Sequence, residues 1–302
     1  MTMPLLTIFT APKPFLDPHI ALIQRNAIRS WLHLGEDVEV LLIGDEPGLT
    51  DIAAELRIVH LPQVQRNKWG TPLVSSIFEL ASCNSCSPLL AYVNADILLM
   101  PDFVEVARTV SSQAEQFLIV GQRWDLPIRR ELDFGEGWVR QLRAEVRVRG
   151  KLHQASGSDY FIFPSQMFTD MPDFAIGRAG WDNWMIFRAR QQGIVVVDAT
   201  PSLMVIHQEH GYAHLPNNRP HYDLEESSQN MIMAGGRLAM YTILDTNCQL
   251  IGGKLRPPRP NALRLLRRVE LWLMPKDAGH RGWRYALARK ARRLRRRLTG
   301  SL

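Results

Sequence analysis

The sequence predicts an α/β fold with a mostly parallel central sheet, followed by a basic helical tail. Short runs of β-branched and other apolar residues alternate with segments whose apolar residues recur at helical spacing. Such alternation is typical of a parallel sheet with crossover connections and helices on both faces. The 302 residues, 46% hydrophobic and 22% charged, suffice for one large domain and an appendage.

The expected elements follow one another along residues 5–206. Residues 5–10 form the first expected strand, and residues 20–34 carry apolar side chains at helical spacing up to Gly35. Further strands are expected at 38–43, 56–61, 89–93, 117–121, 160–163, 194–197 and 203–206, and further helices at 72–81 and 181–192. We find no internal repeat, so a solenoid is excluded and one domain over residues 1–250 is expected.

The C-terminal residues differ sharply in charge from the rest of the chain. Residues 254–302 contain sixteen Lys or Arg against two acidic residues, a net charge of +14 within a chain of net charge +6. The sequence KLRPPRPN at 254–261 precedes this tail, and its prolines cannot continue a helix or a central strand. We therefore expect residues 251–302 to form a basic linker and a helical tail.

The tail carries apolar side chains as well as charge. Trp283, Leu287 and Leu294 share a narrow stripe that arginines surround, which is typical of a helix at a membrane interface. An anionic membrane surface is the expected partner, because aromatic and aliphatic residues accompany the charge. Nucleic acid would also attract it but is the less favoured partner, and a solvated or disordered tail is the third alternative.

The cysteines and the N-terminus indicate the compartment. Cys83, Cys86 and Cys248 are an odd number, which does not suggest a secreted disulfide scaffold, and the single CxxC provides only half of a zinc site. The N-terminal MTMPLL has no basic region, and no uncharged run approaches the roughly 20 apolar residues that span a bilayer. We expect a cytoplasmic protein, soluble or peripheral on the inner face of the membrane.

Asp96 interrupts the most hydrophobic stretch of the chain. The sequence LLAYVNADILL places it just after the strand expected at 89–93. A carboxylate at the carboxyl end of a buried strand is costly unless it is paired or coordinated. Mg²⁺ and Mn²⁺ prefer carboxylate oxygens and often bridge them to substrate phosphates, so a divalent metal site is one interpretation. The alternative is that Asp96 caps the following turn.

Four segments together resemble a known enzyme family. VNADILL, SGSDYFIFP, IGRAGWDNWMI and IHQEHGYAH are similar, in this order, to segments of a family of bacterial and plant GT-A glycosyltransferases. The resemblance covers most of residues 5–240 and implies a GT-A fold. It implies that Asp96 coordinates Mn²⁺ or Mg²⁺ and that Asn94 and Ala95 contact the donor. This chain has Asn-x-Asp where many members have two acids.

The resemblance also assigns roles around the acceptor. Asp182, in a Gly-Trp-Asp sequence before an expected helix, matches the base that removes the acceptor proton in inverting GT-A enzymes. Asp159 and Trp181 are the expected acceptor contacts, and Asp159 follows a serine-flanked glycine that permits close approach to a ligand. The alternatives are a turn before a strand for Asp159, a helix N-cap for Asp182 and a core aromatic for Trp181.

Three histidines follow the last expected strand. By resemblance His207 is the best second metal ligand, whereas His210 and His214 are weaker candidates because Gly211 and Ala213 depart from the family pattern. A neutral imidazole is a frequent metal ligand, and a histidine just past a strand can reach Asp96 across the sheet edge.

Loops after the first strands are expected to bind the nucleotide. Thr10, Ala11 and Pro12 follow the first strand, Asp45 follows the second, and Thr71 precedes a helix whose N-terminal amides favour phosphate. The chain lacks GxxxxGK[ST], and lacks GxGxxG after its first strand. This argues against a P-loop NTPase and a dinucleotide oxidoreductase.

The residues above and the family resemblance together imply a metal-assisted, inverting glycosyltransferase. It would move a sugar from a nucleotide-sugar donor to a hydroxyl of a glycan or glycolipid acceptor, in envelope polysaccharide or glycolipid synthesis. Two alternatives stay open: a nucleotidyltransferase-like enzyme, and a non-catalytic scaffold associated with membrane or nucleic acid.

Overall fold

A computed structural model describes residues 3–210, 224–274 and 282–298, and its main sheet confirms the predicted α/β class. The nine strands of this sheet lie in the order β13-β12-β10-β6-β9-β4-β1-β2-β3. Their bounds are β1 Leu6–Thr10, β2 Val38–Ile43, β3 Val59–Leu61, β4 Leu89–Val93, β6 Phe117–Val120, β9 Tyr160–Pro164, β10 Val195–Asp198, β12 Cys248–Ile251 and β13 Lys254–Arg256. Only β9 and β13 run antiparallel to the strands beside them, so the sheet is mostly parallel as predicted.

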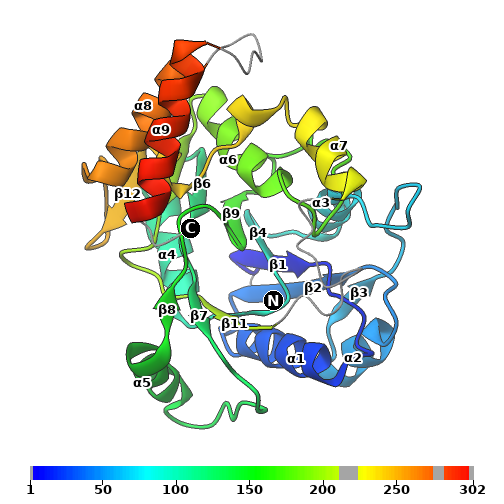
Figure 1. Cartoon of the computed structure of the whole chain (residues 1–302). Helices are drawn as coiled ribbons and strands as arrows, with labels where there is room; N and C mark the ends of the chain where they lie inside the picture. The colour runs from blue at the N-terminus through cyan, green and yellow to red at the C-terminus, as the bar shows by residue number, and fades with distance from the viewer. Residues whose placement is uncertain (1–2, 211–223, 275–281, 299–302) are drawn as a thin grey trace.

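Helices cover both faces of the main sheet (Figure 1). One face packs against α1 Pro18–Leu32, α2 Leu49–Leu56 and α4 Asp102–Ser111, and the other against α3 Val74–Asn84 and α6 Trp181–Gln191. The strands are buried on both sides because consecutive residues alternate between two cores. In β4, for example, Ala91 faces the first core and Tyr92 the second.

A second, four-stranded sheet lies beside the carboxyl edge of β4. Its order is β5-β11-β7-β8, and its bounds are β5 Ile97–Leu98, β11 Ile206–Gln208, β7 Trp124–Leu126 and β8 Lys151–Leu152. The register sets His207 opposite Ile97 on one side and opposite Asp125 on the other. This small sheet therefore brings residues 110 positions apart in the chain to one place.

The predicted first residue was wrong for two strands. The strand expected at 203–206 begins at Ile206, because the Leu203 amide closes a turn onto the carbonyl of Ala199. The strand expected at 56–61 begins at Val59, since residues 49–56 bury Leu49, Ile52 and Ala53 along one side of helix α2.

The tail is helical, as predicted. Helix α8 spans Ala262–Leu273, and the Asn261 side chain caps it by accepting a 2.8 Å hydrogen bond from the Arg264 amide. Helix α9 spans Trp283–Leu298 and lies side by side with α8 (Figure 1). The other described helices are α5 Trp138–Arg149 and α7 Glu225–Met233, with 3₁₀ turns at Arg237–Ala239 and Ile243–Asp245.

No helix in the described ranges has the length and apolar character needed to cross a membrane.

Candidate functional site

The site is built where β4 ends and the small sheet begins. After Val93 the chain turns through Asn94, Ala95 and Asp96, and the Ile97 amide closes the turn onto the Asn94 carbonyl at 3.1 Å. The carbonyl of Asp96 accepts a hydrogen bond from the Gln208 amide at 3.2 Å, which fixes β11 against this turn. The turn thus holds the Asp96 side chain at the carboxyl edge of the sheet, where parallel sheets bind ligands.

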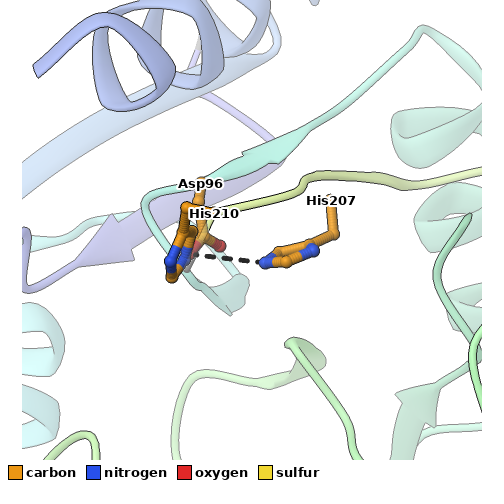
Figure 2. Close-up of side chains that lie close together, drawn as sticks. All are labelled: Asp96, His207 and His210. Atoms are coloured by element: carbon orange, nitrogen blue, oxygen red, sulfur yellow. Dashed lines mark hydrogen bonds and ion pairs between the residues drawn. The ribbon is translucent and has the colours of Figure 1, made fainter. Parts of the chain in front are cut away.

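Asp96, His207 and His210 form a compact cluster (Figure 2). The Nε2 atom of His210 lies 3.0 Å from Asp96 Oδ2, and the Nε2 atom of His207 lies 3.8 Å from the same oxygen. One ligand atom from each residue lies within 4.8 Å of the other two. The three half-buried side chains converge as metal ligands do, and Asp96 with His207 is the pair that the sequence predicted.

The second oxygen of Asp96 sets this carboxylate apart. Asp96 Oδ1 is buried, and no residue that the structure describes is its hydrogen-bond partner. Burial opposes ionisation, but His207, His210 and Lys13 outweigh it and hold the pKa of Asp96 well below its usual range. The chain therefore presents an ionised carboxylate with one unsatisfied buried oxygen, which a cation would satisfy.

Asp125 orients the His207 ring. Its Oδ1 lies 3.0 Å from His207 Nδ1, and its Oδ2 lies 2.7 Å from His153 Nδ1. Although burial opposes ionisation of Asp125, the hydrogen bonds of His153 and His207 and the charge of Arg123 hold its pKa far below its usual range. An ionised Asp125 only accepts hydrogen bonds, so His207 Nδ1 carries a proton. In the neutral ring, the lone pair that can bind a cation is therefore on Nε2, the nitrogen nearer to Asp96.

Lys13 brings a cation from the loop after β1. Its Nζ lies 3.4 Å from His210 Nε2, and its amide and carbonyl form 2.7 and 2.9 Å hydrogen bonds with the Gln24 side chain. Burial lowers the pKa of Lys13, and the charge of Asp96 opposes this shift. The loop therefore holds an amine next to the cluster.

Asn94 and Asp159 join the end of β4 to β9. The Asn94 amide donates to the Asp159 carbonyl at 2.9 Å, and Asn94 Nδ2 donates to Asp159 Oδ1 at 2.9 Å. Arg123 also donates to Asp159, and its Nε donates to Asp125 Oδ1 at 2.9 Å. Buried Asp159 is thus already paired within the protein, and it links the Asn94 turn to the residue that orients His207.

Asp182 lies in the first turn of α6. Gly180 precedes the helix at a φ of 113°, a conformation that side chains with a Cβ rarely adopt, and it lets the chain turn sharply into the helix. The residue is not the N-cap, a place that Gly180 occupies. Burial, aided by the charge of Asp159, raises the pKa of Asp182 to about 6, although backbone amides of the helix terminus oppose the shift.

A large cavity of about 1910 Å³ joins these groups. Its lining includes Asp96, His207 and His210 together with Asp159 and Asp182. The other sequence-predicted residues that line it are Ala11, Pro12, Thr71, Asn94, Ala95 and Trp181.

Two of the expected donor residues do not line this cavity. Thr10 is fully buried, and its Oγ1 has no hydrogen-bond partner within the described ranges. Asp45 is exposed and pairs with Arg66. Trp181 reaches the cavity but is only 5% exposed and packs its ring 4.9 Å from that of Tyr92, so it also belongs to the core, the alternative left open above. His214 lies outside the described residues.

Sequence reasoning overlooked Arg123, Asp125 and His153. These residues belong to β7 and the segments next to β7 and β8, and nothing local distinguishes their side chains from ordinary surface charges. Only the pairing of β7 with β11 sets Asp125 opposite His207. His210, expected as the weaker histidine, lies nearer to Asp96 Oδ2 than His207 does.

The residues present fit a divalent cation. One carboxylate and two imidazoles, with an oriented second partner behind one imidazole, are the composition of many protein metal sites. The unsatisfied Asp96 Oδ1 points to the same conclusion, because a buried anionic oxygen requires a partner.

Comparison with known proteins returned structures only. No family model and no curated protein sequence matches the chain. Among solved structures, TarS of S. aureus in complex with UDP-GlcNAc is 10% identical over 76% of this chain and 65% of that chain, with a TM-score of 0.48. This chain therefore spans slightly less than two thirds of the TarS chain.

Two further similar structures cover more of their own chains. The mannosyltransferase PcManGT of Pyrobaculum calidifontis, in complex with GDP-Man and Mn²⁺, is 12% identical over 100% of this chain and 77% of that chain, with a TM-score of 0.47. Glucosyl-3-phosphoglycerate synthase of Mycobacterium tuberculosis, in complex with Mn²⁺, UDP and glucosyl-3-phosphoglycerate, is 15% identical over 78% and 81%, with a TM-score of 0.48. Because the identities are 15% or lower and the TM-scores are below 0.5, these similarities carry no argument about function. A function has to be inferred from the chemistry of the site.

Proposed function

We propose that this protein is a GT-A-type glycosyltransferase that moves a sugar from a nucleotide-sugar donor to a hydroxyl of an acceptor. The observation that carries the proposal is the buried Asp96 carboxylate, clustered with two imidazoles, in the same cavity as a second carboxyl whose pKa is raised. The first group suits a cation that binds a diphosphate, and the second suits a general base. The resemblance of the segments around Asp96, Asp159, Asp182 and His207 supports the same reaction.

Asp96, His207 and His210 would hold the divalent cation. Two imidazoles beside one carboxylate favour Mn²⁺ over Mg²⁺, because Mg²⁺ prefers oxygen ligands throughout. When bound, the cation neutralises charge on the donor diphosphate and so makes the nucleoside diphosphate a better leaving group. Lys13 adds a nearby amine that binds phosphate oxygen in its protonated form.

Asp182 would act as the base of a direct displacement. Its carboxylate takes the proton from the acceptor hydroxyl while that oxygen attacks the anomeric carbon of the donor sugar. The bond from this carbon to the diphosphate oxygen breaks at the same time, and its electron pair leaves with the diphosphate. Because the hydroxyl attacks from the opposite side, the configuration inverts and no covalent enzyme intermediate forms. With a pKa of about 6, the carboxyl group is mostly ionised at pH 7. Its pKa is also close enough to 7 for the carboxylate to accept a proton readily.

Other cavity residues would position the two substrates. Ala11, Pro12 and Thr71 line the cavity and would contact the nucleotide, and Asn94 and Ala95 would contact the diphosphate. Asp159 would contact the acceptor while Asn94 and Arg123 hold it in place. Thr10 would support the first loop from within, since its side chain is buried.

The proposal extends to the acceptor and to the compartment. We propose a glycan or glycolipid acceptor in envelope polysaccharide or glycolipid synthesis. A cytoplasmic location fits the three cysteines, none of which forms a disulfide in the structure.

The direct test is release of nucleoside diphosphate from a panel of UDP- and GDP-sugars with Mn²⁺, with and without a chelator. At least one donor should be consumed, slowly with water as acceptor, and the chelator should stop the reaction. Asp51→Asn, on the exposed side of α2, is the control for an acid replaced outside the cavity. If no donor were consumed and none shifted the melting temperature, the proposed reaction would be wrong.

A further inference from the structure

The α8–α9 hairpin buries charge and exposes apolar side chains, the reverse of an ordinary surface element. Glu270 is 1% exposed, and its carboxylate lies 2.6 Å from Arg292 Nε and 3.0 Å from a guanidinium nitrogen of Arg295. Buried Arg264 donates to Asp198 of β10 at 3.0 Å, and buried Arg267 donates to both oxygens of Asp245 at 3.0 Å. The contacts of Glu270 hold α8 and α9 together, and those of Arg264 and Arg267 hold the hairpin on the α/β domain.

The outward side of the hairpin is apolar and aromatic. Trp272 of α8 is 72% exposed and Trp283 of α9 is 69% exposed. Leu265 and Val269 lie seven and three residues before Trp272, and Leu287, Leu294 and Leu298 follow Trp283 at helical spacing, all of them exposed. Among the residues that the structure describes, seven of the sixteen exposed large hydrophobic side chains therefore lie on these two helices, which is too dense for ordinary surface scatter.

Basic side chains surround this apolar stripe. The exposed cations of the two helices are Arg268, Arg284, Arg289, Lys290, Arg293, Arg296 and Arg297. Glu270 is the one acidic residue in the described ranges 262–274 and 282–298, and it is buried. Within these described ranges, the face exposed to solvent thus combines apolar anchors with positive charge and no negative charge.

We propose that this face docks on an anionic lipid bilayer, with Trp272, Trp283 and the leucines in the interfacial layer and the cations against headgroups. Exposed aromatic and aliphatic residues gain from leaving water, and each cation gains from the negative surface. A second copy of this chain suits the face poorly, because a two-fold contact would bring its like charges together. A nucleic acid backbone would satisfy the cations and leave the apolar stripe in water.

Docking would also place the cleft at the membrane. Arg296 and Leu298 of α9 line the same cavity as Asp96 and Asp182. Resting on the proposed glycosyl transfer, this arrangement implies an acceptor that the bilayer itself carries, because its hydroxyl would meet the cavity where the hairpin meets the lipid.

Co-sedimentation of the full chain with vesicles tests the docking without any substrate. Binding is expected to phosphatidylcholine vesicles containing phosphatidylglycerol, to be far weaker with phosphatidylcholine alone, and to fall with salt. Trp272→Ala with Trp283→Ala should weaken partitioning by at least about tenfold. Lys290→Gln with Arg293→Gln should weaken it by about 30-fold, from roughly 1 kcal/mol for each cation.

Matched controls come from helix α5. Val148→Ala removes an exposed apolar side chain, and Arg140→Gln with Arg147→Gln removes two exposed cations, so neither should change partitioning. The proposal is overturned if wild type does not bind, if it binds both kinds of vesicle equally, or if the α5 variants lose as much as the hairpin variants. A dimer that the hairpin variants abolish, with no vesicle binding, would instead assign the face to a second copy. Because donor binding is measured without vesicles, failure of the docking is distinguishable from failure of the glycosyl transfer.

Discussion

Asp96 and Glu270 are both acidic residues within basic surroundings, and they differ in how their oxygens are satisfied. Both oxygens of Glu270 have arginine partners in the α8–α9 hairpin. Asp96 shares one oxygen between two imidazoles, while its other oxygen has no partner in the part of the chain that the structure describes. A fully paired buried carboxylate holds structure together, whereas one with an unsatisfied oxygen has room for a ligand.

The surrounding elements strengthen this contrast. Asp96 lies on a turn at the carboxyl edge of a parallel sheet, and it lines the same cavity as Asp182. Glu270 lies between two packed helices, and burial opposes its ionisation, but Arg267, Arg292 and Arg295 hold its pKa below the usual value. The cleft is therefore expected to govern turnover and ligand binding, and the hairpin to govern stability and docking.

Removing the base should have the largest effect on turnover. Asp182→Asn is expected to lower kcat by about 10² to 10⁴-fold, because a positioned general base contributes that much. Nucleoside diphosphate affinity should stay near that of wild type. The wild-type rate should fall as pH drops below about 6, where the carboxylate takes up a proton. A variant that kept the wild-type rate would show that another group removes the proton.

Removing the hairpin carboxylate should have the largest effect on folding. Glu270→Gln removes the buried negative charge that Arg267, Arg292 and Arg295 all contact, so the free energy of unfolding should fall by about 3 to 5 kcal/mol. Urea unfolding measures this change. Mn²⁺ affinity of the folded variant should match wild type, and a large loss of affinity would break the division between the two regions.

Asp96→Asn should show the opposite pattern. Mn²⁺ affinity, measured by calorimetry, is expected to fall by about a hundredfold or more, because the anionic ligand is lost. Mn²⁺ should raise the melting temperature of wild type and of Glu270→Gln, and leave that of Asp96→Asn unchanged. Equal Mn²⁺ stabilisation of all three proteins would remove Asp96 from the site.

A smaller effect is expected one step behind the ligand. Asp125→Asn removes the ionised acceptor that fixes the orientation and the tautomer of the His207 ring. Mn²⁺ affinity should fall by about 10 to 100-fold, as is usual when the hydrogen-bond partner of a metal ligand is lost. Asp133→Asn, an exposed change on the segment that follows, is the control. Unchanged affinity in Asp125→Asn would mean that His207 needs no orientation.

The smallest predicted effect is a gain in stability that depends on pH. The folded pKa of Asp182, about 6, lies above its unfolded value, so the stability it contributes is present below pH about 4 and is lost as pH rises through 6. At pH 7.5 Asp182→Asn avoids a buried charge and should be about 1 to 3 kcal/mol more stable than wild type. Below pH 4 the two proteins should be equally stable, and a constant difference at every pH would contradict the shifted pKa.

Local sequence was sufficient for most of the fold because period and burial agree there. The strand at Leu89–Val93 was predicted at its observed bounds, because its apolar run is too short for a helix and is flanked by turn-forming residues. Helix α2 was missed because eight residues with three buried positions give too little periodicity. The antiparallel direction of β9 depends on the strands beside it, and no local sequence pattern indicates that direction.

Prediction of the site had a similar limit. Local sequence identified Asp96 because it interrupts a hydrophobic stretch, and it identified Asp182 because it follows Gly180 at the start of an expected helix. Asp125 is positioned by strand pairing across 82 residues and carries no local signal. The hairpin was predicted as helical and amphipathic, but the burial of Glu270 among arginines depends on how two helices and the domain meet.

Calorimetric titration of UDP and GDP into the full chain, with Mn²⁺ and with a chelator, tests the central claim most directly. If Asp96, His207 and His210 hold a cation for a diphosphate, one nucleotide should bind in the presence of Mn²⁺, and its affinity should collapse with the chelator and in Asp96→Asn. Equal affinity with and without the metal, or no binding of either nucleotide, would contradict the account.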